Sequence, residues 1–260
     1  MQGRATTRLH GLPMADTTET PEKAMSFLDH LDELRSRLFR SALVLVGAFA
    51  ACWFFHETIL EVILAPIQKY LFEGGEIVYI NITEPFAIYM KASALVAVFI
   101  ASPFLLYQLW AFVAPGLYKR ERRLAVPFLV FGTLFFFAGG YFGYQVAVPV
   151  AARWLISLGD SYQANITLRS AFQFLSRIVL AMGLVFEMPV LIAFFARMGL
   201  VTPAFLWHHF RTAILVIAIV AAIVTPTGDV MTMSVFAGPM ILLYLLGIGV
   251  AWVAARRGDE

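Results

Sequence analysis

Two long apolar segments meet at the stretch Ala111-Phe-Val-Ala-Pro-Gly-Leu-Tyr-Lys-Arg-Glu-Arg-Arg123. Four basic residues in this stretch surround a single acid, Glu121. Because positively charged residues gather in the cytoplasmic loops of membrane proteins, this loop is predicted to lie on the cytoplasmic side. The lone carboxylate has two interpretations. It pairs with a neighbouring base such as Arg122, as exposed charges often do, or it is a docking point for a cationic partner.

The composition places the chain among membrane proteins. Hydrophobic residues make up 60% of the 260 residues and charged residues only 14%, whereas an average globular domain has about 25% charged residues. The 24 phenylalanines would be hard to bury in a soluble domain of this size. We therefore expect an all-α integral membrane protein. The only cysteine, Cys52, excludes an intrachain disulfide.

Six apolar segments are predicted to cross the bilayer, whose core of ~30 Å takes about 20 helical residues. We expect them at residues 38–57, 86–109, 125–149, 171–196, 212–225 and 234–254. The fifth has only 14 residues, which is roughly 21 Å of helix. Either the bilayer thins there or the helix is hidden in a bundle.

The segments between the spans have distinct characters. Residues 1–24 are polar and mixed, so we expect a disordered cytoplasmic extension. Residues 26–37 have the pattern of an amphipathic helix that lies at the membrane surface and runs into the first span. Residues 58–85, with Pro66, and residues 150–170 are expected to be long loops. A tight turn follows the fifth span, and residues 255–260 form a tail.

The basic residues give the orientation. Of the 19 lysines and arginines, 14 lie in the N-terminal region, the 110–124 and 197–211 loops and the tail. The positive-inside rule places these regions in the cytoplasm, so both termini are predicted to be cytoplasmic. The 14 residues are Arg4, Arg8, Lys23, Arg35, Arg37, Arg40, Lys119, Arg120, Arg122, Arg123, Arg197, Arg211, Arg256 and Arg257.

Glu187 lies inside the fourth apolar segment, in the run Leu184-Val-Phe-Glu-Met-Pro189. A carboxyl group at the bilayer centre costs at least ~2.5–3.5 kcal/mol, so it must face a cavity, a partner or water. Pro189 is expected to bend the helix and free a nearby carbonyl. Glu187 is then either a polar site in a groove or a protonated carboxyl bonded to the backbone inside the bundle.

Two further residues are candidates on the predicted cytoplasmic side. Glu33 stands four residues before Arg37, a spacing that favours an ion pair along a helix. Phe112, at the cytoplasmic end of the second span, has the position of an interfacial membrane anchor.

No pattern of an enzyme or a metalloprotein is present in the sequence. It contains no Gly-rich phosphate loop, no nucleophile elbow and no His-Glu-x-x-His run, and His208-His209 lacks metal-ligand spacing. Intramembrane catalysis would need a second polar partner at the depth of the spans, and we find none. We expect no enzyme activity, no cofactor, no metal and no nucleic-acid partner.

Several stretches of the chain form recognisable motifs. Residues Phe27-Leu-Asp-His-Leu-Asp-Glu-Leu-Arg-Ser-Arg-Leu38 and residues 102–123 resemble the N-terminal signature and the first cytoplasmic loop of the TatC family of twin-arginine translocase proteins. Its fourth span and the loop after it are similar to residues 186–190 and 198–203. Positions with a structural or loop role in these motifs are Arg35, Pro66, Pro115 and Asp229.

The resemblance implies a concave, glove-like bundle with short fifth and sixth spans, and a receptor that binds signal peptides carrying consecutive arginines. Glu33 and Glu121 match the acids implicated in holding the arginine pair, and Phe112 matches an aromatic beside them. Glu187 matches an intramembrane glutamate of the concave face. The implied machine exports folded proteins across the cytoplasmic membrane of a prokaryote by means of the proton-motive force.

The resemblance also implies an oligomeric complex with TatA- and TatB-like single-span partners and contact with membrane lipids. The family's partner surface lies on the fifth and sixth spans. This chain departs from it at Met233, where some members have glutamine, and in the length of the turn before Asp229. The alternative function is a six-span transporter of small solutes or ions, although such proteins usually pair charges around a midplane site.

Overall fold

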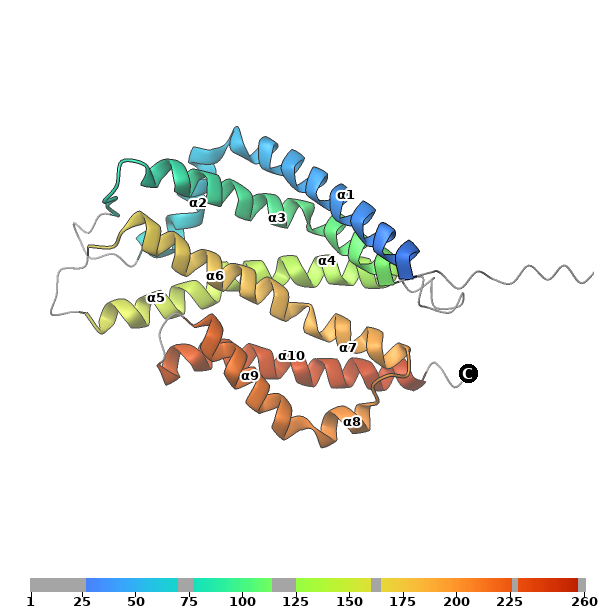
Figure 1. The fold of residues 1–260 in the computed structure, drawn as a ribbon. Coiled ribbons are helices and arrows are strands. Elements are labelled where there is room, and N and C mark those ends of the chain that lie inside the picture. Colours follow the sequence, from blue (N-terminus) through green and yellow to red (C-terminus); the bar gives the residue numbers. More distant parts are fainter. Residues whose placement is uncertain (1–26, 70–76, 114–124, 160–164, 226–228, 257–260) are drawn as a thin grey trace, which may run out of the picture.

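The computed structural model describes residues 27–69, 77–113, 125–159, 165–225 and 229–256. These residues are almost entirely helical (Figure 1). The predicted N-terminal extension, residues 1–24, and most of the predicted tail lie outside them. The helices are α1 (Phe27–Trp53), α2 (His56–Gln68), α3 (Glu84–Val113), α4 (Ala125–Phe142), the π-helical turn η3 (Gly143–Ala147), α5 (Val148–Ser157), α6 (Leu168–Phe186), α7 (Met188–Arg197), α8 (Pro203–His208), α9 (Phe210–Val224) and α10 (Val230–Arg256).

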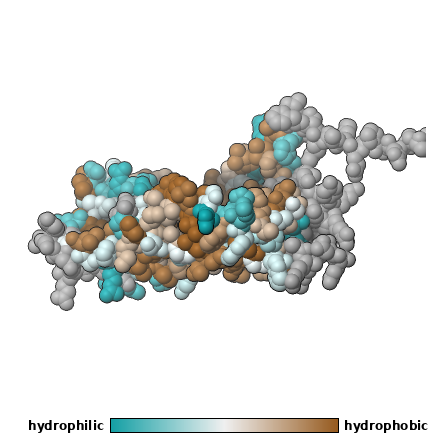
Figure 2. All heavy atoms as spheres, turned by 90° about the horizontal axis from the view of Figure 1, so that it is seen from below, coloured by the Kyte–Doolittle hydropathy of each residue, from teal (hydrophilic) through white to brown (hydrophobic). Residues whose placement is uncertain are grey.

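Five helical stretches of the described chain are long and apolar enough to cross a membrane. They lie in α1, in α3, in the continuous α4–η3–α5 rod, in the α6–α7 pair and in α10. The apolar helix α9 is shorter, at 15 residues. The predicted all-α membrane fold with a short fifth span is thereby confirmed, and apolar side chains cover much of the face seen in Figure 2.

Three predictions about individual segments were wrong. Part of the predicted 150–170 loop is helical, since α5 runs to Ser157 and α6 begins at Leu168. Part of the predicted 58–85 loop is helical, since α2 buries the face formed by Leu60, Ile63 and Leu64. The sixth span is not short, because α10 has 27 residues. The N-terminal amphipathic segment does run into the first span as predicted, and the two form one continuous helix, α1, because no glycine or proline interrupts residues 27–46.

The start of α10 is fixed by Asp229, which explains why this helix is longer than expected. One carboxylate oxygen of Asp229 accepts a hydrogen bond from the backbone N–H of Thr232 at 2.7 Å. The other accepts a bond from the Thr232 hydroxyl at 2.6 Å. Side chains that accept from the first turn in this way stabilise helix N-termini, so α10 begins at Val230, directly after the cap.

Pro66 lies inside α2 rather than in a loop. A proline in a helix has no N–H, so the carbonyl four residues earlier loses its helical partner. That carbonyl belongs to Val62, and it accepts a hydrogen bond from the hydroxyl of Tyr144 in η3. The π-helical turn thus supplies the hydrogen bond that Pro66 removes, and it connects α2 to the third span.

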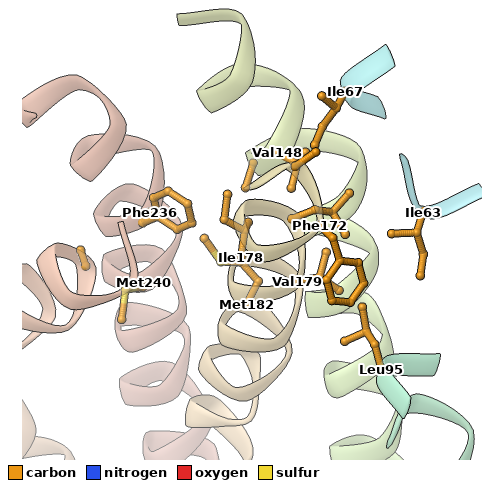
Figure 3. Packing of buried hydrophobic residues seen from close by; sticks show 14 of the residues in the cluster. Ile63, Ile67, Leu95, Val148, Phe172, Ile178, Val179, Met182, Phe236 and Met240 are labelled. Atoms are coloured by element: carbon orange, nitrogen blue, oxygen red, sulfur yellow. The ribbon is translucent and has the colours of Figure 1, made fainter. Parts of the chain in front are cut away.

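The core is built around α6, which crosses the middle of the bundle (Figure 1). Figure 3 shows Ile178 directed towards Phe236 of α10, while Phe172 lies on the other side, towards Ile63 of α2 and Leu95 of α3. The buried residues of α6 recur every three or four positions along the helix. Other helices pack against it on two sides.

Helix α4 approaches α6 closely at Gly139. A Cβ atom added there would lie 2.4 Å from the backbone oxygen of Met182 and 2.7 Å from the Cβ of Phe186. No larger residue fits at that distance, so the glycine permits the close contact between the two helices.

Candidate functional site

Glu33 is held by Arg37 one turn further along α1. The Nε and Nη2 atoms of Arg37 donate to the same carboxylate oxygen, Oε1, at 2.9 and 2.5 Å. The two side chains are only 22% and 21% exposed. The ion pair suggested by their four-residue spacing is therefore present.

The same arginine connects α1 to α3. Its Nη1 atom donates to the side-chain oxygen of Gln108 at 3.2 Å, and Gln108 is buried. Arg37 consequently spans two acceptor oxygens, one from the first helix and one from the end of the third. The sequence analysis did not select Gln108. Its position as a lone amide within an apolar run was the signal that it could bond to a polar side chain of another helix.

Phe112 joins the cluster through His30. The two rings stack with centroids 4.4 Å apart and planes at 19°. His30 also lies beside Glu33, with 3.8 Å between Nδ1 and the second carboxylate oxygen, Oε2. Two predicted site residues, Glu33 and Phe112, are thus brought together by a histidine that sequence reasoning did not select. Its position three residues before Glu33 was the available signal.

We name these five side chains the α1–α3 cluster: His30, Glu33, Arg37, Gln108 and Phe112. The cluster lies where α1 begins and α3 ends, at the same end of the bundle as the start of α4 and the ends of α7 and α10 (Figure 1). The cluster mixes one carboxylate, one guanidinium, an amide and two stacked rings, which is suited to binding a planar cation.

Two predicted residues, Glu121 and Pro115, lie outside the described residues. Helix α3 ends at Val113 and α4 begins at Ala125, so the segment with both residues connects the cluster to the next span. The remaining predicted residue on α1, Arg35, is exposed.

Glu187 lies at the junction of α6 and α7, which is where Pro189 was expected to interrupt the span. Its side chain is only 8% exposed. Oε2 lies 3.1 Å from the position that a Cβ on Gly132 of α4 would occupy. Oε1 is buried and has no hydrogen-bond partner within the described part of the chain. The alternative in which this oxygen is bonded to the backbone is therefore not observed.

An apolar groove of about 380 Å³ begins beside this junction. Three phenylalanines of α4, Phe128, Phe131 and Phe135, form one wall, and residues of α7 and α10 form the others. Pro189, two residues after Glu187, also lines it. Glu187 itself is not among the residues that line this groove, so its predicted role as a polar site in a groove stays a prediction.

Among the described residues, no group of three or more histidine, cysteine, aspartate or glutamate side chains could hold a metal ion. The two described acids among the predicted site residues are separate, since Glu33 lies on α1 and Glu187 at the junction of α6 and α7.

The family model of the Sec-independent protein translocase protein (TatC) matches residues 29–239. The chain belongs to the TatC family. It is therefore a component of a protein translocase, and the family predicted from its motifs is confirmed.

Relatives and solved structures agree with this assignment. The Sec-independent protein translocase protein TatC of Koribacter versatilis is 46% identical over 89% of this chain and 86% of its own length. The TatC of Campylobacter jejuni is 41% identical over 84% and 90%. The crystal structure of the twin-arginine translocase receptor TatC superposes with a TM-score of 0.76 at 32% identity, over 86% of this chain and 99% of that one. The TatC fold therefore extends over most of the chain.

Proposed function

We propose that this chain is the signal-peptide receptor core of a twin-arginine translocation system. In this proposal it exports folded proteins across the cytoplasmic membrane of a prokaryote, driven by the proton-motive force, with both termini in the cytoplasm. The observation that carries the proposal is the α1–α3 cluster, in which His30 lies against both Glu33 and Phe112.

The chemistry of the cluster suits a guanidinium ligand. A guanidinium presents a planar fork of N–H donors, which matches a carboxylate in two-pronged geometry and stacks on aromatic rings. Glu33 offers carboxylate oxygens, and the stacked rings of His30 and Phe112 offer a flat apolar surface beside them. Two acids, Glu33 and Glu121, would provide one acceptor for each arginine of the pair.

Specificity in the proposal has a repulsive part. Lys119, Arg120, Arg122 and Arg123 surround Glu121 in the sequence. They disfavour other cations and also attract anionic lipid headgroups. A peptide with two guanidiniums then gains enough from the carboxylates to overcome this repulsion.

Glu187 is proposed to act after recognition. A buried carboxylate oxygen without a partner among the described residues, beside an apolar groove, is suited to receiving a polar group of an inserting segment. Its role would be in the deep insertion of the signal peptide or the entry of a partner helix, not in the first binding step.

The partners proposed are TatA- and TatB-like single-span proteins within an oligomeric complex. Helix α9 is short and exposes Leu215, Ile219 and Ile223. A second apolar helix could pack against these side chains. The alternative function, a transporter of small solutes or ions, is not favoured by a specific observation, because Glu187 has no charged partner among the described residues.

The test is the affinity of a fluorescent twin-arginine peptide for the purified full chain in detergent. Glu33→Gln and Glu121→Gln are each expected to weaken binding by about tenfold, since each removes a charge-assisted hydrogen-bond acceptor. Asp32→Asn, an exposed acid next to Glu33 on α1, is the matched control and is expected to bind normally. Unchanged affinity in the double variant of Glu33 and Glu121 would refute the proposed site.

A further inference from the structure

The apolar groove between α4, α7 and α10 has a cation at one end. Arg197, the last residue of α7, is among the residues that line it. The other lining residues are alanine, leucine, phenylalanine, proline and valine, and no acidic side chain is among the described residues that form the walls. The groove therefore combines a charged end with an apolar length.

The groove runs along the helices and not across them. Its walls are formed within residues 127–135 of α4, 189–197 of α7 and 246–253 of α10. At 1.5 Å per residue, each of these stretches is roughly 10–12 Å long. Helix α4 begins, and α7 and α10 end, at the same end of the bundle (Figure 1). The groove thus extends inward from that end and stops before the middle of the spans.

This length matches one leaflet of a bilayer. A hydrocarbon core of ~30 Å gives roughly 15 Å per leaflet, so the groove covers most of one leaflet but less than half of the path of a membrane-spanning helix. Its outer side is open, since Phe131, Leu246 and Val253 are exposed. A lipid acyl chain suits a groove of this length better than a partner helix does.

The charge at the end of the groove suits a lipid headgroup. In the proposed orientation, the end of α7 lies at the cytoplasmic surface, where the leaflet carries anionic lipids. A guanidinium pairs with a phosphate through two parallel hydrogen bonds. Because it has five N–H donors, Arg197 can do so and still keep a contact within the protein. Glu187 lies ten residues before Arg197, beyond the opposite end of the groove, so its carboxylate is remote from the headgroup position.

We propose that the groove binds one acyl chain of an anionic phospholipid from the cytoplasmic leaflet, with the lipid phosphate on Arg197. The inference takes only the membrane orientation from the proposed function, and it involves none of the residues proposed to hold the arginine pair. A lipid in this position fills the space between α4, α7 and α10. Because a ligand that binds only the folded state stabilises that state, the lipid strengthens the packing of these three helices.

The test measures lipid binding by native mass spectrometry of the purified full chain in detergent. The chain is titrated with dioleoyl-phosphatidylglycerol or with zwitterionic dioleoyl-phosphatidylcholine, and the anionic lipid is expected to bind more tightly. Arg197→Gln should weaken phosphatidylglycerol by about tenfold and phosphatidylcholine by at most about threefold, because it removes a charge-assisted hydrogen-bond donor. Arg197→Lys keeps the charge and should lose less affinity than Arg197→Gln.

A second variant tests the apolar part of the site. Val250 lies at an exposed position of α10 in the groove wall, so Val250→Trp fills the groove and should weaken both lipids by about tenfold or more. This variant keeps the inference testable if Arg197→Gln does not fold. The matched controls are Arg211→Gln and Val216→Trp, at exposed positions of α9 outside the groove. Both controls should leave the two affinities unchanged.

Two results would overturn the inference. An equal loss for both lipids in Arg197→Gln would mean that this arginine only stabilises the end of α7, as a cation in the last turn of a helix does. Unchanged binding in Val250→Trp would mean that the measured lipid lies elsewhere on the protein.

Photo-crosslinking identifies the occupant and separates this inference from the proposed receptor function. Phosphatidylglycerol with a photoreactive acyl chain should crosslink to Phe131 and Val250. If a photoreactive twin-arginine peptide labels them and the lipid does not, the groove is a peptide site and the lipid inference fails. If the lipid binds as expected but the double variant of Glu33 and Glu121 binds the peptide normally, the receptor site fails and the lipid site stands.

Discussion

Glu84 and Glu187 are both buried to the same extent, with 8% of each residue exposed, yet their hydrogen bonding is opposite. Glu84, at the start of α3, accepts bonds from the backbone N–H groups of Ile80 at 3.2 Å and Arg169 at 2.9 Å. A longer contact of 3.5 Å comes from the N–H of Asn81. Glu187 has a buried oxygen with no partner among the described residues.

The comparison separates a structural carboxylate from a functional candidate. Glu84 links the segment before α3 to the start of α6, next to the bridge in which Val78 pairs with Thr167. A buried group with satisfied hydrogen bonds contributes to specificity and stability, whereas an unsatisfied one costs free energy. The folded chain keeps this free-energy cost at Glu187, as expected if the carboxylate binds a polar group when a signal peptide or partner helix is present.

The largest loss of stability is expected for Glu84→Ala. Removal of the carboxylate leaves three backbone donors without their acceptor, and we expect the free energy of unfolding to fall by about 3 kcal/mol. Thermal unfolding of the purified chain in detergent measures the change. Glu61→Ala, an exposed acid on α2, is the control. A loss below about 0.5 kcal/mol would mean that Glu84 is not the structural member of the comparison.

Asp229→Ala is expected to have an intermediate effect. This carboxylate is also satisfied, by the N–H and the hydroxyl of Thr232, but it lies at a helix end and is only partly buried. Loss of an N-cap of this type costs about 1 kcal/mol, measured by the same unfolding assay. Thr232→Val removes only the hydroxyl bond and should cost less than Asp229→Ala. The reverse order would contradict the assignment of Asp229 as the cap.

The smallest effect on stability is expected for Glu187→Gln. The amide removes an unpaired buried acid and keeps its shape, so the free energy of unfolding should stay within about 0.5 kcal/mol or rise. Binding of the twin-arginine peptide should be unchanged, but export into membrane vesicles should fall by about tenfold or more. Normal export would remove Glu187 from the mechanism, and a large loss of stability would make it a structural residue like Glu84.

The sequence predicted the parts of the molecule that depend on local pattern. The apolar segments, the short α9 and the interruption at Glu187 followed from hydropathy and from Pro189. The pair of Glu33 and Arg37 followed from a spacing of four residues. Each of these features is determined by neighbours in the chain, and for that reason it could be predicted.

Features that depend on tertiary contacts were missed. Glu84 was only one acid in a predicted loop, because its acceptor role requires the N–H of Arg169, 85 residues away. The bond from Arg37 to Gln108 spans 71 residues. Most of helix α2 lies in the predicted 58–85 loop, and the contact that compensates for the backbone bond lost at Pro66 comes from the hydroxyl of Tyr144, 82 residues after Val62.

The most direct test of the proposed receptor site is a photo-crosslink from the signal peptide. A twin-arginine peptide with a photoreactive residue next to the arginine pair is bound to the purified full chain, irradiated and mapped by mass spectrometry. We expect crosslinks to residues near Glu33, Phe112 and Glu121, which disappear when the arginines are replaced by glutamines. Crosslinks confined to the groove beside Glu187, with none at the α1–α3 cluster, would contradict the proposed site.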